Sequence, residues 1–329
     1  MSSVADEVRA ARAACGWIDR SARGKLIARG ADRQAFLHNM LSNRIAPLKA
    51  GQGCRAELLD ERAHVIADLR LYVDADAVLI DTEPGLASVV RERLEKYVIM
   101  DDVAFEDATA SLALVTLVGP KAATALWRNT GGVVPPPAPF DHRFMPVAGV
   151  DARVVCARWT GPGDVDVFLP AAAAASVRDA LARSVAGEGG AALSADAFEV
   201  MRIEGGIARQ GAELDDVVAL EARLDEAGAL ALDKCYLGQE VIARIVGRGH
   251  VNRLLAGIIL SGDRPAVRGA TIIAGEKEVG HVVASVFSPT LGKPIATVYL
   301  RREAAAPGTS VDVEGTAATV AALPFVAPI

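Results

Sequence analysis

A change of pattern near residue 250 is the feature that most constrains the fold of this chain. Before this point, apolar residues recur at both helical and strand spacing. From Arg253 onward the chain consists of short β-rich runs separated by glycine and proline, namely "LLAGIIL", "ATIIAG", "EVGHVVASVFS", "KPIATVYL" and "SVDVEG". Closely spaced short strands are typical of a small β-barrel or sandwich. The sequence therefore predicts an α+β body over residues 1–250 and a β domain over 251–329.

The body is predicted to mix helices with antiparallel strands. Residues 54–82 contain three β-rich runs with polar turns at 60–62 and 74–76, which is an antiparallel signature. Asp32 and Ser194 are expected to cap helices. Other helices are expected over about 84–97 and 171–186, and the Pro/Gly-rich segment 131–140 is expected to divide the body into two lobes. Residues 205–235 lack clear periodicity, as functional loops often do.

Composition and charge exclude several classes of protein. The 329 residues are 51% hydrophobic and 23% charged, as in globular domains. No apolar run approaches the roughly 20 residues that cross a bilayer, and the N-terminus has no apolar signal region. We therefore expect a cytoplasmic protein without a membrane partner. A net charge of −6 argues against a nucleic-acid partner, and four scattered cysteines with five dispersed histidines predict neither disulfides nor a bound metal.

The stretch "LDKCYLGQEVIARI", residues 232–245, combines groups that no amphipathic helix or strand requires. Lys234, Cys235, Tyr236 and Gln239 precede an apolar run, so we interpret the stretch as a binding loop that leads into a helix. A thiol beside a lysine and near a helix N-terminus tends toward the reactive thiolate form. The alternative is a buried structural cysteine, the role expected for the other cysteines, which are Cys15, Cys54 and Cys156.

Basic residues gather just after this loop in a chain that is acidic overall. Lys234, Arg244, Arg248, His250 and Arg253 fall within 20 residues. If the segment is helical, Arg244 and Arg248 lie four positions apart on one face. A solvated basic face is the alternative for any single residue, whereas the cluster as a whole favours anion binding.

"KCYLGQE" resembles the signature of the YgfZ family of folate-binding proteins, which are relatives of the glycine-cleavage T-protein, an aminomethyltransferase. The family's glycine between the lysine and the cysteine is missing here. The stretches "GADRQAFLHNMLSNRIAPLKAGQGCRAELLD", "VMRIEGGIARQGAEL" and "VGHVVASVFSPTLGKPIATVYL" resemble further family elements, so the resemblance spans about residues 15–325. It implies a cloverleaf-like T-protein fold of antiparallel sheets and helices, closed by a C-terminal β-barrel.

The resemblance also implies a ligand, tetrahydrofolate or a derivative, and a role in assembling or repairing iron–sulfur clusters of client enzymes. The pterin edge of folate presents adjacent N–H donors that a carboxylate can accept, and Glu204 is expected to fill this role. The alternative for Glu204 is a solvated position at the end of a helix. The expected binding set is completed by Lys234, Tyr236, Gln239, Arg244 and Arg248, with Cys235 as the functional thiol.

Two other functions stay open. In T-proteins a Gly-x-x-x-Asp-Asp strand supplies an aspartate beside the folate, and the corresponding "AHVIADLRLY" keeps Asp68 but has Ala67 in place of the neighbouring aspartate. A second family element survives only in part in "RWTGPGDVDVF". Because methylene transfer needs a complete constellation, these losses favour an accessory protein over an active aminomethyltransferase. The remaining alternative is a demethylase-type folate module, although the chain has no Gly-x-Gly-x-x-Gly flavin-binding fingerprint.

Overall fold

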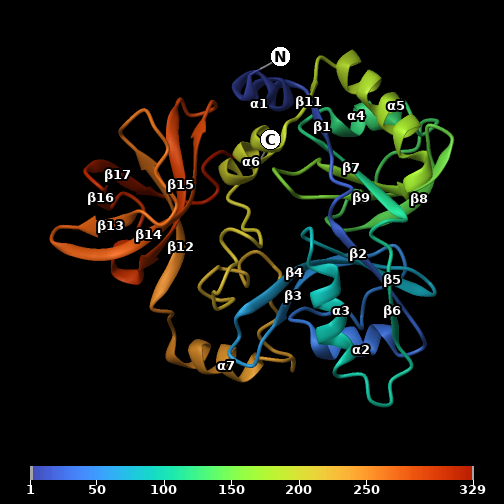
Figure 1. Cartoon of the computed structure of the whole chain (residues 1–329), viewed down its shortest axis with the longest axis horizontal. Coiled ribbons are helices and arrows are strands. Elements are labelled where there is room, and N and C mark those ends of the chain that lie inside the picture. Colours follow the sequence, from blue (N-terminus) through green and yellow to red (C-terminus); the bar gives the residue numbers. More distant parts are fainter. Residues whose placement is uncertain (1–2, 328–329) are drawn as a thin grey trace.

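The computed structural model of this chain describes residues 3–327. It contains two sheets with helices and a closed six-stranded barrel (Figure 1). The predicted α+β architecture with a C-terminal β-barrel is confirmed. No helix within residues 3–327 is long and apolar enough to cross a membrane.

The first sheet has five strands in the order β3-β4-β5-β2-β6. Its strands are β2 (Gly24–Arg29), β3 (Gly53–Leu59), β4 (Val65–Val73), β5 (Ala77–Thr82) and β6 (Ala104–Asp107). Helices α2 (Arg33–Met40) and α3 (Ala87–Glu95) bury their apolar residues against one face of this sheet. The other face is turned toward the second sheet, where Tyr72 of β4 packs on Phe168.

The second sheet has six strands in the order β11-β1-β7-β10-β9-β8. Its strands are β1 (Gly16–Asp19), β7 (Leu112–Val118), β8 (His142–Val147), β9 (Val150–Cys156), β10 (Val165–Pro170) and β11 (Ala191–Ala192). Helices α4 (Ala122–Trp127) and α5 (Ala174–Gly187) cover its outer face. The segment 131–140, predicted to divide the body into two lobes, joins α4 to β8 within this second sheet and does not separate the two sheets; after β6 the chain passes from the first sheet to the second at residues 108–111.

The barrel closes in the strand order β12-β15-β14-β13-β16-β17. Its strands are β12 (Arg253–Leu260), β13 (Thr271–Ala274), β14 (Lys277–Ser288), β15 (Lys293–Arg301), β16 (Ser310–Val313) and β17 (Thr316–Ala321). The irregular segment 205–238 lies between the barrel and the sheets (Figure 1). Its apolar residues pack against the β3–β4 hairpin on one side and against the barrel on the other.

Three further helices connect these parts. Helix α1 (Val4–Ala13) packs on α6 (Ala195–Glu204), and α7 (Gln239–Arg248) leads into the barrel. Ser194 caps α6 as predicted, because its hydroxyl accepts a hydrogen bond from Ala197 N. Asp32 holds the predicted N-cap position of α2, but its carboxylate instead accepts a hydrogen bond from Asp102 N.

Candidate functional site

The inner face of the five-stranded sheet is buried but charged. Along β4, Asp68, Arg70 and Tyr72 alternate with leucines that face the helices. Because successive side chains of a strand point to opposite faces, the three polar residues are turned toward the second sheet. The register of β3 on β4 places Glu57 opposite Asp68 and Arg55 opposite Arg70. We name Arg55, Glu57, Asp68 and Arg70 the central charged cluster.

Arg55 lies between the two carboxyl groups of this cluster. Its Nε atom donates a hydrogen bond to Asp68 Oδ1 at 2.7 Å and lies 3.4 Å from Glu57 Oε1. Glu57 is 0% exposed and Asp68 is 4% exposed. Burial and the adjacent Asp68 carboxyl raise the pKa of Glu57 well above its usual range, because both disfavour a second negative charge.

Trp159 faces the cluster from the segment between β9 and β10. The guanidinium carbons of Arg20 and Arg70 lie 3.6 Å and 3.1 Å from its ring centroid. Two guanidinium groups are too large to share one ring face at these distances, so the indole is held between them. The indole Nε1 donates to Asp166 Oδ2 at 2.9 Å. Cation–π contacts of this kind stabilise arginine where water is excluded.

Several buried polar atoms here have no hydrogen-bond partner within the described part of the chain. They are both carboxylate oxygens of Glu57, Nε and Nη1 of Arg70, the Tyr72 hydroxyl and Nη1 of Arg20. Buried polar groups are normally paired with protein or water. These atoms therefore offer both donors and acceptors to a polar molecule between the sheets.

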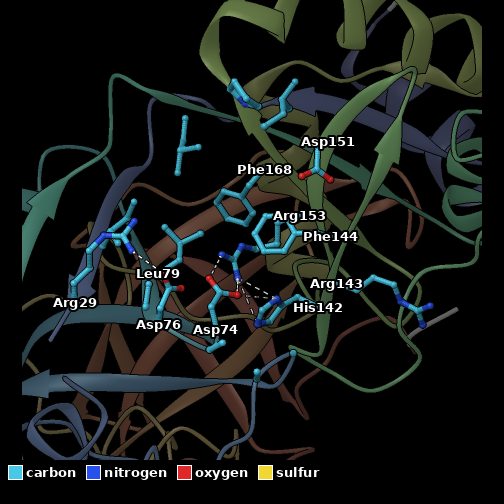
Figure 2. A pocket seen from close by; sticks show the side chains of 18 residues that line it. Arg29, Asp74, Asp76, Leu79, His142, Arg143, Phe144, Asp151, Arg153 and Phe168 are labelled. Atoms are coloured by element: carbon cyan, nitrogen blue, oxygen red, sulfur yellow. Dashed lines mark hydrogen bonds and ion pairs between the residues drawn. The ribbon is translucent and has the colours of Figure 1, made fainter. Parts of the chain in front are cut away.

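A cavity of about 760 Å³ opens between the same two sheets, toward the β4–β5 turn (Figure 2). Two of its lining residues contact Tyr72, whose ring centroid lies 5.6 Å from that of Phe168 and 5.7 Å from that of His142. Tyr72 is two residues from Arg70 and points to the same side of β4. Through these ring contacts Tyr72 connects the cavity lining with the central charged cluster on the same face of β4.

The cavity combines an apolar lining with a buried ion pair. Arg153 donates to both oxygens of Asp74, at 2.9 and 2.5 Å, and its Nη1 lies 3.0 Å from His142 Nδ1 (Figure 2). Burial and Arg153 lower the pKa of His142 to about 4, so this ring is neutral at pH 7 and can accept the hydrogen bond. The lining also includes Ile27, Arg29, Leu79, Leu112, Arg143, Phe144 and Asp151. Small-molecule sites commonly have this size and composition.

Two family models together match most of the chain. The GCVT N-terminal domain matches residues 1–231, and the glycine cleavage T-protein C-terminal barrel domain matches residues 253–327. The chain belongs to the glycine-cleavage T-protein family. An aminomethyltransferase of Chlorobium luteolum is 30% identical, over 99% of this chain and 91% of that protein. One from Thermotoga petrophila is 27% identical, over 92% of this chain and 82% of that protein.

A solved structure shows the same fold. The glycine cleavage system aminomethyltransferase T from Bartonella henselae superposes with a TM-score of 0.88, at 24% identity, over 98% of this chain and 90% of that protein. The sheets, the intervening segment and the barrel are thus the T-protein arrangement over nearly the whole length.

The loop predicted from the sequence to bind a ligand, residues 232–239, lies beside the C-terminal end of α2 and the β3–β4 turn. Lys234 is buried, and its Nζ donates to Leu41 O at 2.7 Å and lies 4.8 Å from the Tyr236 ring centroid. Cys235, between these two buried residues, is exposed. Gly238 has φ +85°, and a Cβ there would lie 2.5 Å from Asp60 O, so the turn into α7 requires glycine.

The basic residues of α7 point into solvent. Arg244 and Arg248 are exposed, and Arg244 pairs with Glu240 at 2.9 Å within the helix. Gln239, at the first position of α7, is half-buried. The helix predicted from the apolar run is confirmed. The structure does not bring Gln239, Arg244 and Arg248 to the space between the sheets.

Glu204 lies at a junction of three elements. It is 0% exposed, so the solvated alternative is wrong. Its Oε2 accepts from Arg12 of α1 at 2.6 Å, and its Oε1 accepts from Ser288 of the barrel at 2.5 Å. Both carboxylate oxygens therefore already have protein partners. The structure does not join Glu204 to Asp68 or to the Cys235 loop.

The remaining cysteines differ in exposure. Cys15 is buried, as expected, whereas Cys54 and Cys156 are half-buried. Burial raises the pKa of Cys15 to about 11 and that of Cys54 to about 12, and it also raises the pKa of Cys156. These three thiols are therefore protonated at neutral pH.

Sequence reasoning found Asp68 but missed the residues around it. The available signal was the alternation in "RAE" and "DLRLY", where charged or phenolic side chains occupy every second position of two strands. Such a pattern usually describes a solvated sheet face. Arg55, Glu57 and Arg70 become candidate site residues only because the second sheet packs over this face and buries them.

Proposed function

We propose that this chain is a tetrahydrofolate-binding protein that supports the assembly or repair of iron–sulfur clusters in client enzymes. The observation that carries the proposal is the exposed Cys235 thiol, held between two buried side chains of a loop that resembles the YgfZ signature. A cysteine with only a structural role is usually buried in the core, as Cys15 is, whereas Cys235 is exposed.

The space between the two sheets fits a folate-sized ligand. The cavity of about 760 Å³ supplies aromatic and aliphatic surface for a flat ring system. Glu57, Arg70 and Tyr72 do not line this cavity, but they lie on the same face of the first sheet, and their unpartnered atoms supply further acceptors and donors there. A carboxylate there suits the N–H donors of a pterin edge, so the Glu57–Asp68 pair competes with Glu204 for the anchoring role.

Two variants decide between these anchors. A carboxylate that anchors the pterin contributes about 1.5–3 kcal/mol to binding, the range for hydrogen bonds to charged groups. We expect Asp68→Asn to weaken tetrahydrofolate binding by this amount in calorimetric titration. If Glu204→Ala produces this loss instead, the anchor is Glu204, and unchanged affinity in both variants places the ligand elsewhere.

The exposed thiol is tested by alkylation and by complementation. Cys235 should react faster than Cys15, Cys54 and Cys156, whose thiols are held in the protonated form by burial. Mass-spectrometric labelling measures the four rates. Cys235→Ser should abolish rescue of iron–sulfur enzyme activity in a bacterial strain without its own YgfZ-type protein, while Cys156→Ser should rescue. Full rescue by Cys235→Ser would show that the Cys235 thiol is not needed for this function.

An active aminomethyltransferase is the second candidate, and the names of the relatives favour it. Asp68 is retained and faces the space between the sheets. Against it, Asp68 Oδ1 is engaged by Arg55 at 2.7 Å, and Ala67 supplies no second carboxylate. Turnover with tetrahydrofolate and an aminomethyl-lipoyl carrier protein would establish this candidate. Loss of that turnover in Asp68→Asn would then assign the step to this site.

A further inference from the structure

Glu57 and Asp68 form a buried pair of carboxyl groups that share a single close cation. They are register partners on neighbouring antiparallel strands, and Arg55 Nε lies within 3.4 Å of both carboxyl groups. Arg55 Nε hydrogen-bonds Asp68 at 2.7 Å, whereas its 3.4 Å contact with Glu57 is not a hydrogen bond. A fully ionised pair would therefore leave Glu57 without a donor in a buried site.

The surrounding charges do not supply a second cation to Glu57. Arg70 is the other positive group acting on it, but the Arg70 guanidinium lies against the Trp159 ring and its Nη2 donates to Arg158 O at 3.3 Å. Glu83 is paired with Arg23, and Arg55 interacts electrostatically with Glu83 as well as with Asp68. Two adjacent carboxylates cannot both ionise under these conditions without a large penalty.

We propose that Glu57 and Asp68 hold one proton between them, with Glu57 as a positioning residue that donates this proton to the Asp68 carboxylate. The proton satisfies one oxygen of each group and fixes the Asp68 carboxylate between two donors, Arg55 and Glu57. Glu57 thereby sets which Asp68 oxygen is left to face a ligand. No motif of the sequence had assigned a role to Glu57.

The pair also predicts a response to the ligand, and this part rests on the proposed folate site. A pterin edge that brings N–H donors to the pair replaces the donor that the shared proton provides. The proton then leaves to solvent, and both carboxyl groups remain as acceptors. Binding at pH 7 should therefore release close to one proton, as for two coupled acids that titrate together.

Infrared spectroscopy of the unliganded protein tests the shared proton directly. The wild-type protein at pH 7 should show a protonated carboxyl carbonyl band that is lost in Glu57→Gln. The band should also be lost in Asp68→Asn, because Arg55 then pairs with an ionised Glu57. Glu278→Gln, an exposed control on β14, should keep it. A band that persists in Asp68→Asn would show a Glu57 proton held by burial alone, and an unchanged spectrum in both variants would overturn the proposal.

The pH dependence of stability is a second test, and it can be applied to variants that fold less stably than the wild type. A group whose pKa is raised by folding binds more protons in the folded state. The contribution of Glu57 to stability should therefore fall as the pH rises above the pKa of about 4.3 that a glutamate has in the unfolded chain. Glu57→Gln should remove this fall, and its melting temperature should decline less between pH 5 and pH 8 than that of the wild type. Parallel curves for the two proteins would contradict a raised proton affinity at Glu57.

Proton release is measured by titrating tetrahydrofolate calorimetrically in buffers of different ionisation enthalpy. Release should be close to one proton for the wild type and near zero for Glu57→Gln. Binding without release would overturn the coupling of ligand to proton. If tetrahydrofolate does not bind at all, the proposed function fails, whereas the infrared result still decides whether the proton is shared.

Discussion

The two faces of the five-stranded sheet are built from alternate residues of the same strands, yet they differ completely in chemistry. The face covered by α2 and α3 is a continuous apolar core. The face turned toward the second sheet carries the central charged cluster, and its residues are just as buried. Both faces exclude water, but the inner face combines an apolar cluster around Tyr72 and Leu79 with buried charges.

This difference separates a surface that stabilises the fold from one that is available for chemistry. Replacing a buried ion pair by well-packed apolar residues is often neutral or stabilising. A charged inner face is therefore costly for the fold, and unpartnered atoms of Glu57, Arg70 and Tyr72 add to this cost. Stability alone therefore does not account for the charged face.

Removing Arg55 should give the largest effect. Arg55→Leu leaves Asp68 and Glu57 buried without their cation, and this should lower the free energy of unfolding by about 3–5 kcal/mol. Urea denaturation at pH 7 measures the change. The control is Arg29→Leu, which breaks an ion pair with Asp76 whose side chains are 52% and 82% exposed and should cost at most about 1 kcal/mol. Equal losses would mean that the inner face is not electrostatically distinct.

A substitution on the apolar face should have a different signature. Leu69→Ala creates a void under α2 and α3 and should cost about 2–5 kcal/mol, without changing how stability varies with pH. Chemical denaturation at pH 5 and pH 8 tests both parts. Val89→Ala, on the exposed side of α3, should stay within about 0.5 kcal/mol of the wild type. A strongly pH-dependent loss in Leu69→Ala would indicate that the two faces are coupled.

A pair of tyrosines gives the smallest and sharpest test. The Tyr72 hydroxyl has no partner within residues 3–327, whereas the Tyr299 hydroxyl donates to Glu213 O at 2.8 Å. Tyr72→Phe should therefore leave stability unchanged or raise it slightly, while Tyr299→Phe should lower it by about 1 kcal/mol. Thermal unfolding compares the two variants. A loss in Tyr72→Phe as large as that in Tyr299→Phe would show that the Tyr72 hydroxyl is not an unused donor.

Local pattern was sufficient to predict most of the elements but not the site. The three strands within residues 54–82 and the change to a β domain after residue 250 followed from alternation and turn residues, which are properties of neighbouring positions. The meeting of Arg55 with Asp68 depends on register, and the burial of both depends on a second sheet contributed by residues 112–170. Neither is encoded within a short window.

The predicted ligand residues show the same limit. Motif resemblance grouped Glu204, Cys235 and Arg244 into one expected pocket, but the structure places them on three separate elements. Glu204 is occupied by Arg12, which is 192 positions earlier in the chain. The sequence does not distinguish a carboxylate that is paired within the fold from one that is free to bind a ligand.

The junction at Glu204 has a consequence for the synthesis of the chain. Arg12 leaves the ribosome 192 residues before Glu204, and Ser288 follows Glu204 by a further 84 residues. At about 5–20 residues per second, the first helix waits roughly 10–40 s for the carboxylate that will hold it. During that time Val8 and Ala11 lack the part of their packing that α6 provides. The N-terminal helix is therefore translated first, but its ion pair with Glu204 forms only after most of the chain has been synthesised.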